Sequence, residues 1–350
     1  MFLTSILFLS LQAPVTQAAV APDSEISRHI ASVSSYTPHR VYKSGKKRFE
    51  DFESMLADVA KADVVFLGEE HDDPGTHRLE RAALEGIGRR RGTVVLAMEM
   101  FERDAQPSLN DYLSGKMAEA DFLKASRPWP KYVTDYRPMV EFAKAKGWPV
   151  IAGNVPRRLA SLVGRKGLVG VDSLPTVDRA FVAAQLNCPR DKYYARFKET
   201  MGDMSGHGQK ITPQEAEAMI GRFYDAQCVK DETMGEAIAS AREKYPDAIV
   251  VHVNGSFHSD FAMGTADRAR QRLSGQRIAV VSFVPATDLD AVDGKKIRKQ
   301  GDYIVFTLKP PTPPKPATPA TPATPAVAPA VPATPGAAAP VMPKPPASSN

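Results

Sequence analysis

Two histidines occupy the same short frame, Gly-x-x-His, at distant places in the 350-residue chain. The first frame runs from Gly68 to His71 and the second from Gly255 to His258. Each follows an apolar run rich in β-branched residues, so each glycine allows a sharp turn after a strand and the histidine can face back over the strand end. Imidazoles in this position are candidates for acid–base chemistry or metal binding.

Carboxylates accompany both histidines. Two imidazoles with one to three carboxylates would suit a divalent metal or a general acid–base pair. The alternative is that these side chains only cap helices and bind one another. We take as candidate catalytic residues Glu69, Glu70, His71, Glu99 and His258, and as candidate metal ligands His71, Glu99 and His258.

Short apolar runs must position these residues. Most are continuous rather than alternating, which is typical of strands covered on both faces, and helical patterns separate them. We predict an α/β fold with a mainly parallel, doubly wound sheet, in which polar side chains from four strand ends meet at one rim. The predicted strands are 64–67, 94–98, 150–152, 249–253 and 278–283, with an edge strand at 303–308.

Two further parts of the body have recognisable patterns. A hairpin is predicted at 41–49, with Gly45 in its turn. Residues 172–248 lack a convincing strand, and we predict there a helical insert packed over one end of the sheet, with 104–145 adding helices on the same side. A capping box at 212–215 begins an apolar helical stripe that is broken near Val229.

The two ends of the chain differ from the body. Residues 1–21 contain an apolar run of signal-sequence length followed by small residues, which predicts a cleaved signal peptide and a periplasmic or otherwise exported protein. The alternative is a buried N-terminal helix. No cysteine follows this run, so a soluble rather than lipid-anchored form is expected. Residues 309–350 hold 15 of the 30 prolines and are predicted to be a disordered tail, leaving 22–308 as one α/β domain.

Charge and cysteine usage narrow the expectations further. The net charge of the chain is +5, and three of its lysines lie in the tail, so the body carries only +2. Nucleic acid is therefore not an expected partner. The two cysteines, Cys188 and Cys228, are expected to form a disulfide, with two free thiols as the alternative. His77 and the basic clusters at 46–48, 89–91 and 295–299 are expected to face solvent.

The predicted insert contains side chains of the kinds that hold haem iron. The plain alternative is a methionine-rich loop beside ordinary helix-face tyrosines. These side chains are Tyr193, Tyr194, Met201, Met204 and His207.

Five segments, in order, resemble the ChaN-like haem-binding branch of the Tiki/TraB/erythromycin-esterase superfamily. They are VVFLGEEHDDPGTHRLE, LAMEMFERDAQPSLNDYLSG, VIAGNVPRR, YDAQCVKDETM and VHVNGSFHSDFAMG. The resemblance implies a haem-binding protein of iron uptake that works with envelope uptake components. It also implies a tyrosine ligand to the iron and a haem that bridges a homodimer. The candidate ligands are Tyr193 and Tyr194, and further candidate cofactor contacts are Met204, His207, Asn154 and Arg157.

Two other functions stay open on the sequence. The first is a hydrolase in which His71 or His258 acts as general base, or in which a metal at the rim activates water. The second is an envelope interaction protein that depends on its proline-rich tail.

Overall fold

The computed structural model describes residues 36–202 and 212–309 of the chain. The predicted signal peptide, the tail from 310 onward and the candidates Met204 and His207 lie outside these residues. In the described part, no helix combines the length and apolar character needed to cross a membrane.

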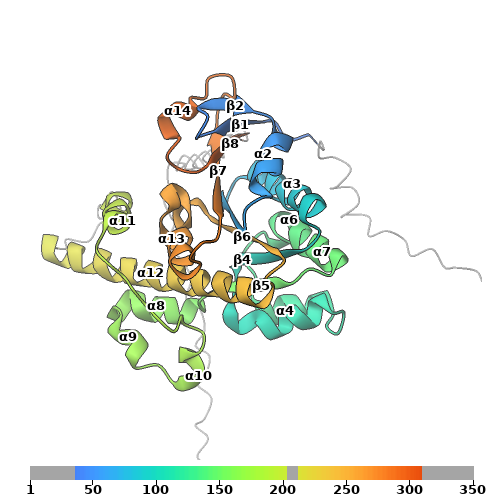
Figure 1. Cartoon of the computed structure of the whole chain (residues 1–350). Helices are drawn as coiled ribbons and strands as arrows, with labels where there is room; N and C mark the ends of the chain where they lie inside the picture. The colour runs from blue at the N-terminus through green and yellow to red at the C-terminus, as the bar shows by residue number, and fades with distance from the viewer. Residues whose placement is uncertain (1–35, 203–211, 310–350) are drawn as a thin grey trace, which may run out of the picture. The chain divides into compact units, whose positions relative to one another are not determined.

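An eight-stranded sheet forms the centre of the fold (Figure 1). From β8 to β5 the neighbouring strands are parallel, whereas β1 pairs antiparallel with β2 and with β8. This confirms the predicted α/β class and its mainly parallel sheet. In the spatial order β2-β1-β8-β7-β3-β6-β4-β5, the strands are β1 (His39–Lys43), β2 (Arg48–Glu50), β3 (Val64–Glu69), β4 (Val94–Glu102), β5 (Val150–Asn154), β6 (Ile249–Gly255), β7 (Ile278–Ala286) and β8 (Tyr303–Leu308).

The last strand is not the edge strand that the sequence predicts. The predicted hairpin is present as β1 and β2, and β1 adds to β8 with Val41 opposite Val305. β8 therefore lies between β1 and β7. A run of apolar residues has the same appearance at an edge and inside a sheet, so the sequence of β8 does not reveal its second neighbour.

Helices cover both faces of the sheet, and the segment 104–145 lies on the face opposite to the helix of residues 213–244, whereas the sequence predicts it on the same side as the insert. On one face the strand residues Val65, Leu96 and Val251 pack against helices. On the other face Val64 and Val95 pack against α12 (Pro213–Lys244) and α13 (Gly264–Arg272). Both faces of each strand are apolar, so the strand sequences do not show which face a given helix covers. The helices of the first face are α2 (Phe52–Val59), α3 (Pro74–Arg91), α4 (Gln106–Leu113), α5 (Glu119–Ser126), α6 (Tyr132–Asp135) and α7 (Arg137–Lys146).

Between β5 and β6 the described residues form five helices joined by loops, from Arg157 at the start of the first helix to Lys244 at the end of the last. The longest helix of this insert starts at the predicted capping box, in which the backbone N–H of Glu215 donates to the hydroxyl of Thr212. It then runs unbroken through Val229, where the apolar stripe is interrupted, because neighbours surround its middle and bury polar residues there too. The elements of the insert are α8 (Arg157–Lys166), α9 (Val169–Asp172), α10 (Thr176–Arg179), α11 (Lys192–Gly202) and α12 (Pro213–Lys244), followed after β6 by α13 (Gly264–Arg272).

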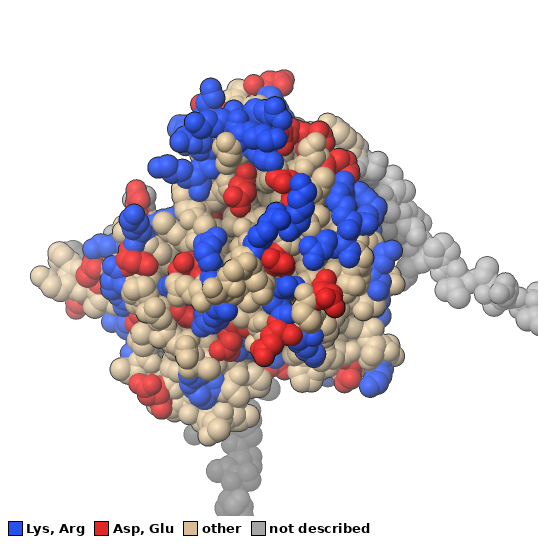
Figure 2. Space-filling view, viewed as in Figure 1, with Lys and Arg blue, Asp and Glu red and all other residues tan. Residues whose placement is uncertain are grey.

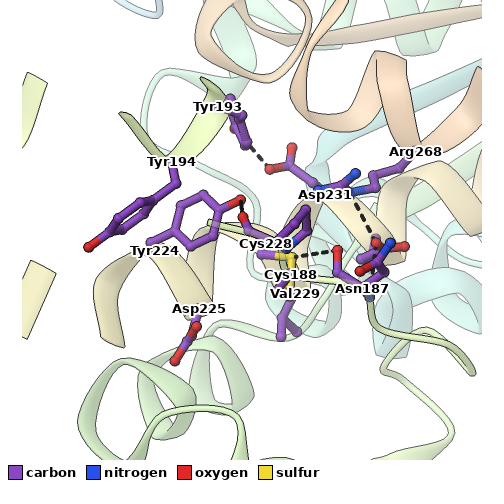
Figure 3. The surroundings of a disulfide bond; sticks show 12 residues. Asn187, Cys188, Tyr193, Tyr194, Tyr224, Asp225, Cys228, Val229, Asp231 and Arg268 are labelled. Atoms are coloured by element: carbon purple, nitrogen blue, oxygen red, sulfur yellow. Dashed lines mark hydrogen bonds and ion pairs between the residues drawn. A yellow bond between two sulfur atoms is a disulfide. The ribbon is translucent and has the colours of Figure 1, made fainter. Parts of the chain in front are cut away.

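The predicted disulfide joins Cys188, just before α11, to Cys228 in the middle of α12 (Figure 3). Their Cα atoms are 5.7 Å apart. Around the bridge, Tyr193 and Phe197 of α11 pack against Tyr224 of α12. The covalent bond and this small aromatic core together hold α11 on α12.

Two of the predicted basic surfaces gather at one end of the described part. In Figure 2, Lys and Arg side chains cover the region of the β1–β2 hairpin and α14 (Gly294–Ile297). The side chains of Arg89 and Arg90 in the third cluster are also exposed. The exposed members at the hairpin and at α14 are Lys46, Lys47, Arg48, Lys295, Lys296, Arg298 and Lys299.

Replacing both cysteines by serine (C188S/C228S) is expected to lower the free energy of unfolding by about 3–4 kcal/mol. The physical reason is that the bridge closes a loop with a sequence separation of 40 residues, which restricts the unfolded chain. Urea unfolding with and without a reductant measures this, and the reduced native chain should match the double variant. An unfolding curve that reductant leaves unchanged would contradict the expectation.

Candidate functional site

Three neighbouring strand ends bring the Gly-x-x-His frames together. β6 lies between β3 and β4, and the backbone N–H of Gly255 donates to Glu99 Oε2 at 2.8 Å. A Cβ at Gly255 would lie 2.8 Å from the ring of His71, so only glycine lets His71 lie over the end of β6. His258 approaches from the other side, with Nε2 3.3 Å from Glu99 Oε1. Both histidines therefore border one carboxylate.

His71 has one engaged and one open ring nitrogen. Its Nδ1 donates to Glu69 Oε1 at 2.5 Å, and the hydroxyl of Tyr136 donates to the same oxygen at 2.7 Å. Burial opposes protonation, but the hydrogen bond with Glu69 and the charge of Glu99 raise the pKa of His71. The side chain is 44% exposed, and among the described residues nothing hydrogen-bonds Nε2. This nitrogen can exchange a proton with a bound molecule.

His258 is fully engaged. Its Nδ1 donates to Asp231 Oδ1 at 2.6 Å, while Nε2 faces Glu99. Burial alone would lower the pKa of His258, but the charges of Glu99 and Asp231 outweigh it and raise the pKa to about 10. His258 is therefore an imidazolium at neutral pH, and it stabilises negative charge at the rim instead of accepting protons.

Asp231 of α12 links the rim to the insert. Besides His258, it accepts a hydrogen bond from the hydroxyl of Tyr193 at 2.9 Å (Figure 3) and one from the hydroxyl of Thr265 at 2.8 Å. A chain of contacts thus runs from Tyr193 through Asp231 and His258 to Glu99. Sequence reasoning did not identify Asp231. The available signal was its place inside the segment YDAQCVKDETM, which carries part of the family resemblance.

His77 is buried below the rim and does not face solvent as predicted. It is 4% exposed, and its Nδ1 lies 3.2 Å from Glu69 Oε2 and 3.3 Å from Glu80 Oε2. The reason is that α3 starts at Pro74, so His77 and Glu80 lie one turn apart on the face that covers the sheet. Sequence reasoning also missed Glu80.

These buried groups carry opposite charges that stabilise one another. Burial opposes ionisation of Glu69, but hydrogen bonds from His71 and His77 lower its pKa to about 2. Burial likewise opposes the charge on His77, yet Glu69 and Glu80 raise its pKa to about 11. Burial, followed by the charge of Glu69, raises the pKa of Glu80.

A metal ion would find its most closely spaced ligands in this buried layer. Among the described residues, Glu69, His77 and Glu80 offer ligand atoms within 4.8 Å of one another. This set differs from the predicted ligands His71, Glu99 and His258, which stay a prediction. Both nitrogens of His258 already face carboxylates, so metal binding there would have to replace one of these contacts.

Residues 55–269 match the family model described as haem-binding uptake, Tiki superfamily, ChaN. The chain belongs to this family. ChaN of Campylobacter jejuni, whose structure is described as showing cofacial haem binding, shares the fold with a TM-score of 0.58. It is 17% identical, and the match covers 77% of this chain and 96% of that one.

Other solved structures are less similar. The erythromycin esterase EreC has a TM-score of 0.40 at 10% identity, covering 71% of this chain and 77% of its own. A Bacillus cereus protein has a TM-score of 0.38 at 13% identity, covering 66% of this chain and 69% of its own. No curated protein matches the chain by sequence.

The two candidate tyrosines of this ChaN-family chain have different surroundings. Tyr193 is 3% exposed and donates to Asp231, whereas Tyr194 is half-buried and donates to Glu217 Oε1 at 2.8 Å. Burial raises both pKa values, and Asp231 and Glu217 add to the effect. Figure 3 shows Tyr193 directed toward Asp231 and Tyr194 directed away from it.

The remaining candidates lie around the rim without sharing one contact. The exposed Glu70 accepts a hydrogen bond from the hydroxyl of Ser256 at 3.1 Å. Asn154 is buried, and its amide donates to the backbone oxygen of Glu99, so it supports strand β4. Arg157 is exposed at the start of α8.

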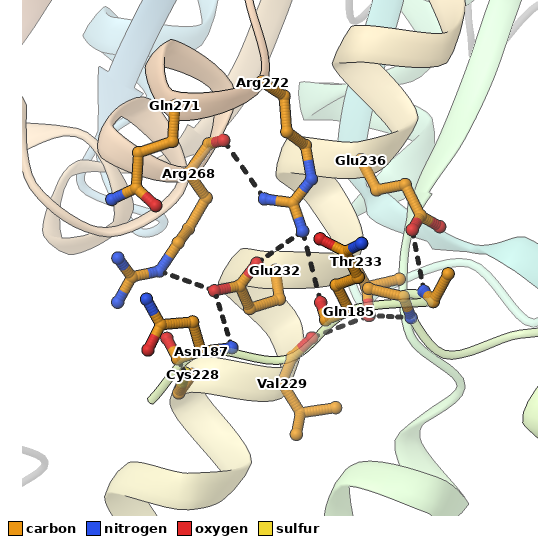
Figure 4. Close-up of polar contacts among 12 residues, drawn as sticks. Gln185, Asn187, Cys228, Val229, Glu232, Thr233, Glu236, Arg268, Gln271 and Arg272 are labelled. Atoms are coloured by element: carbon orange, nitrogen blue, oxygen red, sulfur yellow. Dashed lines mark hydrogen bonds and ion pairs between the residues drawn. The ribbon is translucent and has the colours of Figure 1, made fainter. Parts of the chain in front are cut away.

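The segment that leads into Cys188 and α11 is fixed to α12 by backbone contacts (Figure 4). The N–H of Ala184 donates to Glu236 Oε2 at 2.7 Å, and the N–H of Asn187 donates to Glu232 Oε1 at 3.2 Å. Arg272 of α13 binds the other oxygen of Glu232 at 2.6 Å. α12 thus presents Asp231 to the rim and Glu232 to this segment, which fixes the position of α11.

The raised pKa of His258 predicts how stability depends on pH. Its contribution to stability is fully present below the unfolded pKa of about 6.5 and is lost as the pH rises toward the folded value of about 10. Between pH 7.5 and 9 the variant H258Q should therefore lose about 1.4 kcal/mol less stability per pH unit than the native chain. Urea unfolding across this range tests it. Equal slopes for the two proteins would show that His258 does not hold the extra proton.

Proposed function

We propose that this chain binds haem in iron uptake, with Tyr194 as the ligand to the iron. The observation that carries the proposal is the match of residues 55–269 to the haem-binding uptake family, a range that contains the whole of α11. The geometry favours Tyr194 over Tyr193, because a buried hydroxyl that donates to Asp231 is not accessible to iron without breaking that contact.

The surroundings of Tyr194 suit a flat, apolar ligand with a metal at its centre. Tyr224 packs its ring against Tyr194 at 4.9 Å, and Met201 belongs to the same apolar cluster. When bound, haem supplies an iron that a phenolate oxygen can coordinate. Glu217 already accepts the proton of the Tyr194 hydroxyl and can receive it when the phenolate forms.

The assembly and location of this function are further parts of the proposal. Tyr194 is half-buried, so a porphyrin held there would be accessible to a second copy of the chain in a haem-bridged homodimer. The predicted signal peptide supports a periplasmic location, where a soluble carrier would exchange haem with envelope uptake components.

The variants Y194F and Y193F separate the two tyrosines. Haemin titrated into the native chain should give a shifted Soret band with the features of a high-spin tyrosinate complex. Y194F should lose these features and weaken binding by about tenfold or more, which corresponds to at least about 1.4 kcal/mol. Y193F should keep the spectrum and the haemin affinity of the native chain. Unchanged spectra in Y194F would contradict the assignment of the ligand.

A hydrolase is the second candidate function, and the open nitrogen of His71 favours it. Glu69 and Tyr136 hold the ring of His71, while its Nε2 faces outward beside Glu99 and the imidazolium of His258. A histidine oriented by a carboxylate is a common general acid–base device in hydrolysis. Simple haem carriage does not require this arrangement.

H71A is the decisive variant for the hydrolase. If the rim hydrolyses esters or peptides, H71A should lower kcat by about 10²- to 10⁴-fold with haemin binding unchanged. Metal content measured on the same native sample shows whether an ion takes part. A native chain that turns over no substrate of an ester and peptide panel would contradict this second function.

A further inference from the structure

The end of the protein formed by the β1–β2 hairpin and α14 concentrates positive charge. Segments 40–50 and 286–302 contain nine basic and five acidic residues, a net charge of +4. The whole chain before the tail carries +2, so the rest of it is net negative. Figure 2 shows the basic side chains together on one surface, which we call the basic end.

Packing holds the two parts of the basic end side by side. Arg40 of β1 donates to the backbone oxygen of Leu289, at 3.1 Å, in the loop before α14. Tyr42 contacts Gly294 so closely that a Cβ at this glycine would lie 2.2 Å from the ring. Leu289 and Ile297 complete a small apolar cluster with Tyr42. The charges of the hairpin and of α14 are therefore presented by a fixed surface.

Most of these charges are not neutralised by the protein. Glu50 compensates Arg48 at 3.0 Å and Lys46 at 3.6 Å, and Asp293 is occupied in capping α14 through the N–H of Lys295. Across residues 36–202 and 212–309, five exposed basic residues of this surface form no salt bridge. They are Lys47, Lys295, Lys296, Arg298 and Lys299.

An exposed aromatic ring lies among the charges. Phe49 of the hairpin is 36% exposed, and the guanidinium of Arg40 covers one face of its ring at 3.9 Å. Its other neighbours are Tyr42 and Phe306, so the ring lies on the same side of the sheet as α14. Basic side chains around an exposed aromatic ring are typical of surfaces that bind at a lipid headgroup layer.

We propose that the basic end docks the protein on an anionic lipid surface. The lysines and arginines would contact the headgroup phosphates, and Phe49 would enter the boundary between headgroups and acyl chains. The inference does not depend on haem binding, because none of these residues belongs to the rim or to α11. Such docking would hold a carrier close to a membrane without a covalent anchor.

Vesicle binding of the full chain tests the proposal, with phosphatidylglycerol–phosphatidylcholine vesicles compared with pure phosphatidylcholine. K295E/K296E should weaken binding to the anionic vesicles by about 30-fold or more, since each basic residue near such a surface contributes roughly a factor of five. Raising the salt concentration should weaken native binding in the same way.

The matched control is R89E/R90E, which changes the net charge equally. Arg89 and Arg90 are already paired with Glu53, at 3.2 Å and 2.6 Å, and belong to neither segment of the basic end, so this variant should bind vesicles nearly as well as the native chain. F49A adds a second test. It should weaken vesicle binding but leave binding of soluble inorganic polyphosphate unchanged, because only a membrane offers an apolar layer to the ring.

Three outcomes would overturn the proposal. Equal binding of the native chain to anionic and neutral vesicles would exclude recognition of headgroup charge. Equal losses in K295E/K296E and R89E/R90E would show that net charge, and not this surface, determines binding. Binding of polyphosphate without binding of anionic vesicles would assign the surface to a soluble polyanion. Each comparison uses only variants whose unfolding temperature equals that of the native chain.

Discussion

One buried carboxylate determines how the parts of this fold meet. Asp231 accepts hydrogen bonds from His258 at the rim, from Tyr193 on α11 and from Thr265 on α13. A buried charge without such partners costs several kcal/mol, so each of these elements must reach it in the native state. Because Asp231 lies in the middle of α12, that helix has to pass unbroken beside the ends of the strands.

The need to pair buried charges also limits which of the candidate groups are free for chemistry. His77 and His258 each lie between two carboxylates, so their charges are compensated inside the protein. His71 differs because one of its nitrogens stays open toward solvent. Tyr194 is half-buried and donates to the exposed Glu217, whereas Tyr193 is buried and donates to Asp231. Among the candidate residues that the structure describes, His71 on the sheet and Tyr194 on the insert are therefore the more accessible reactive groups.

The sequence alone was sufficient wherever a feature has a local cause. Continuous apolar runs that end in Gly68 and Gly255 predicted the strands and the convergence of the rim, and Thr212 with Glu215 predicted the start of α12. The disulfide followed from the number of cysteines. These signals depend on neighbouring residues or on composition, which a single sequence contains.

Features that depend on distant packing could not be predicted in this way. The burial of His77 depends on how α3 covers the sheet, and the role of Asp231 depends on three elements that are far apart in the sequence. The second neighbour of β8 and the sheet face covered by residues 104–145 depend on tertiary packing alone. Polar residues in a helix usually indicate solvent, and this is why Asp231 and Glu80 were missed.

The most direct test is an NMR titration of the His258 imidazole in the native chain and in the variant D231N. This substitution keeps the size of the side chain at position 231 and removes its charge. Our account predicts a native pKa near 10 that falls by about one to three pKa units in D231N, because a charged partner in direct contact is lost. A pKa that is near 6.5 in the native chain, or that is the same in both proteins, would contradict it.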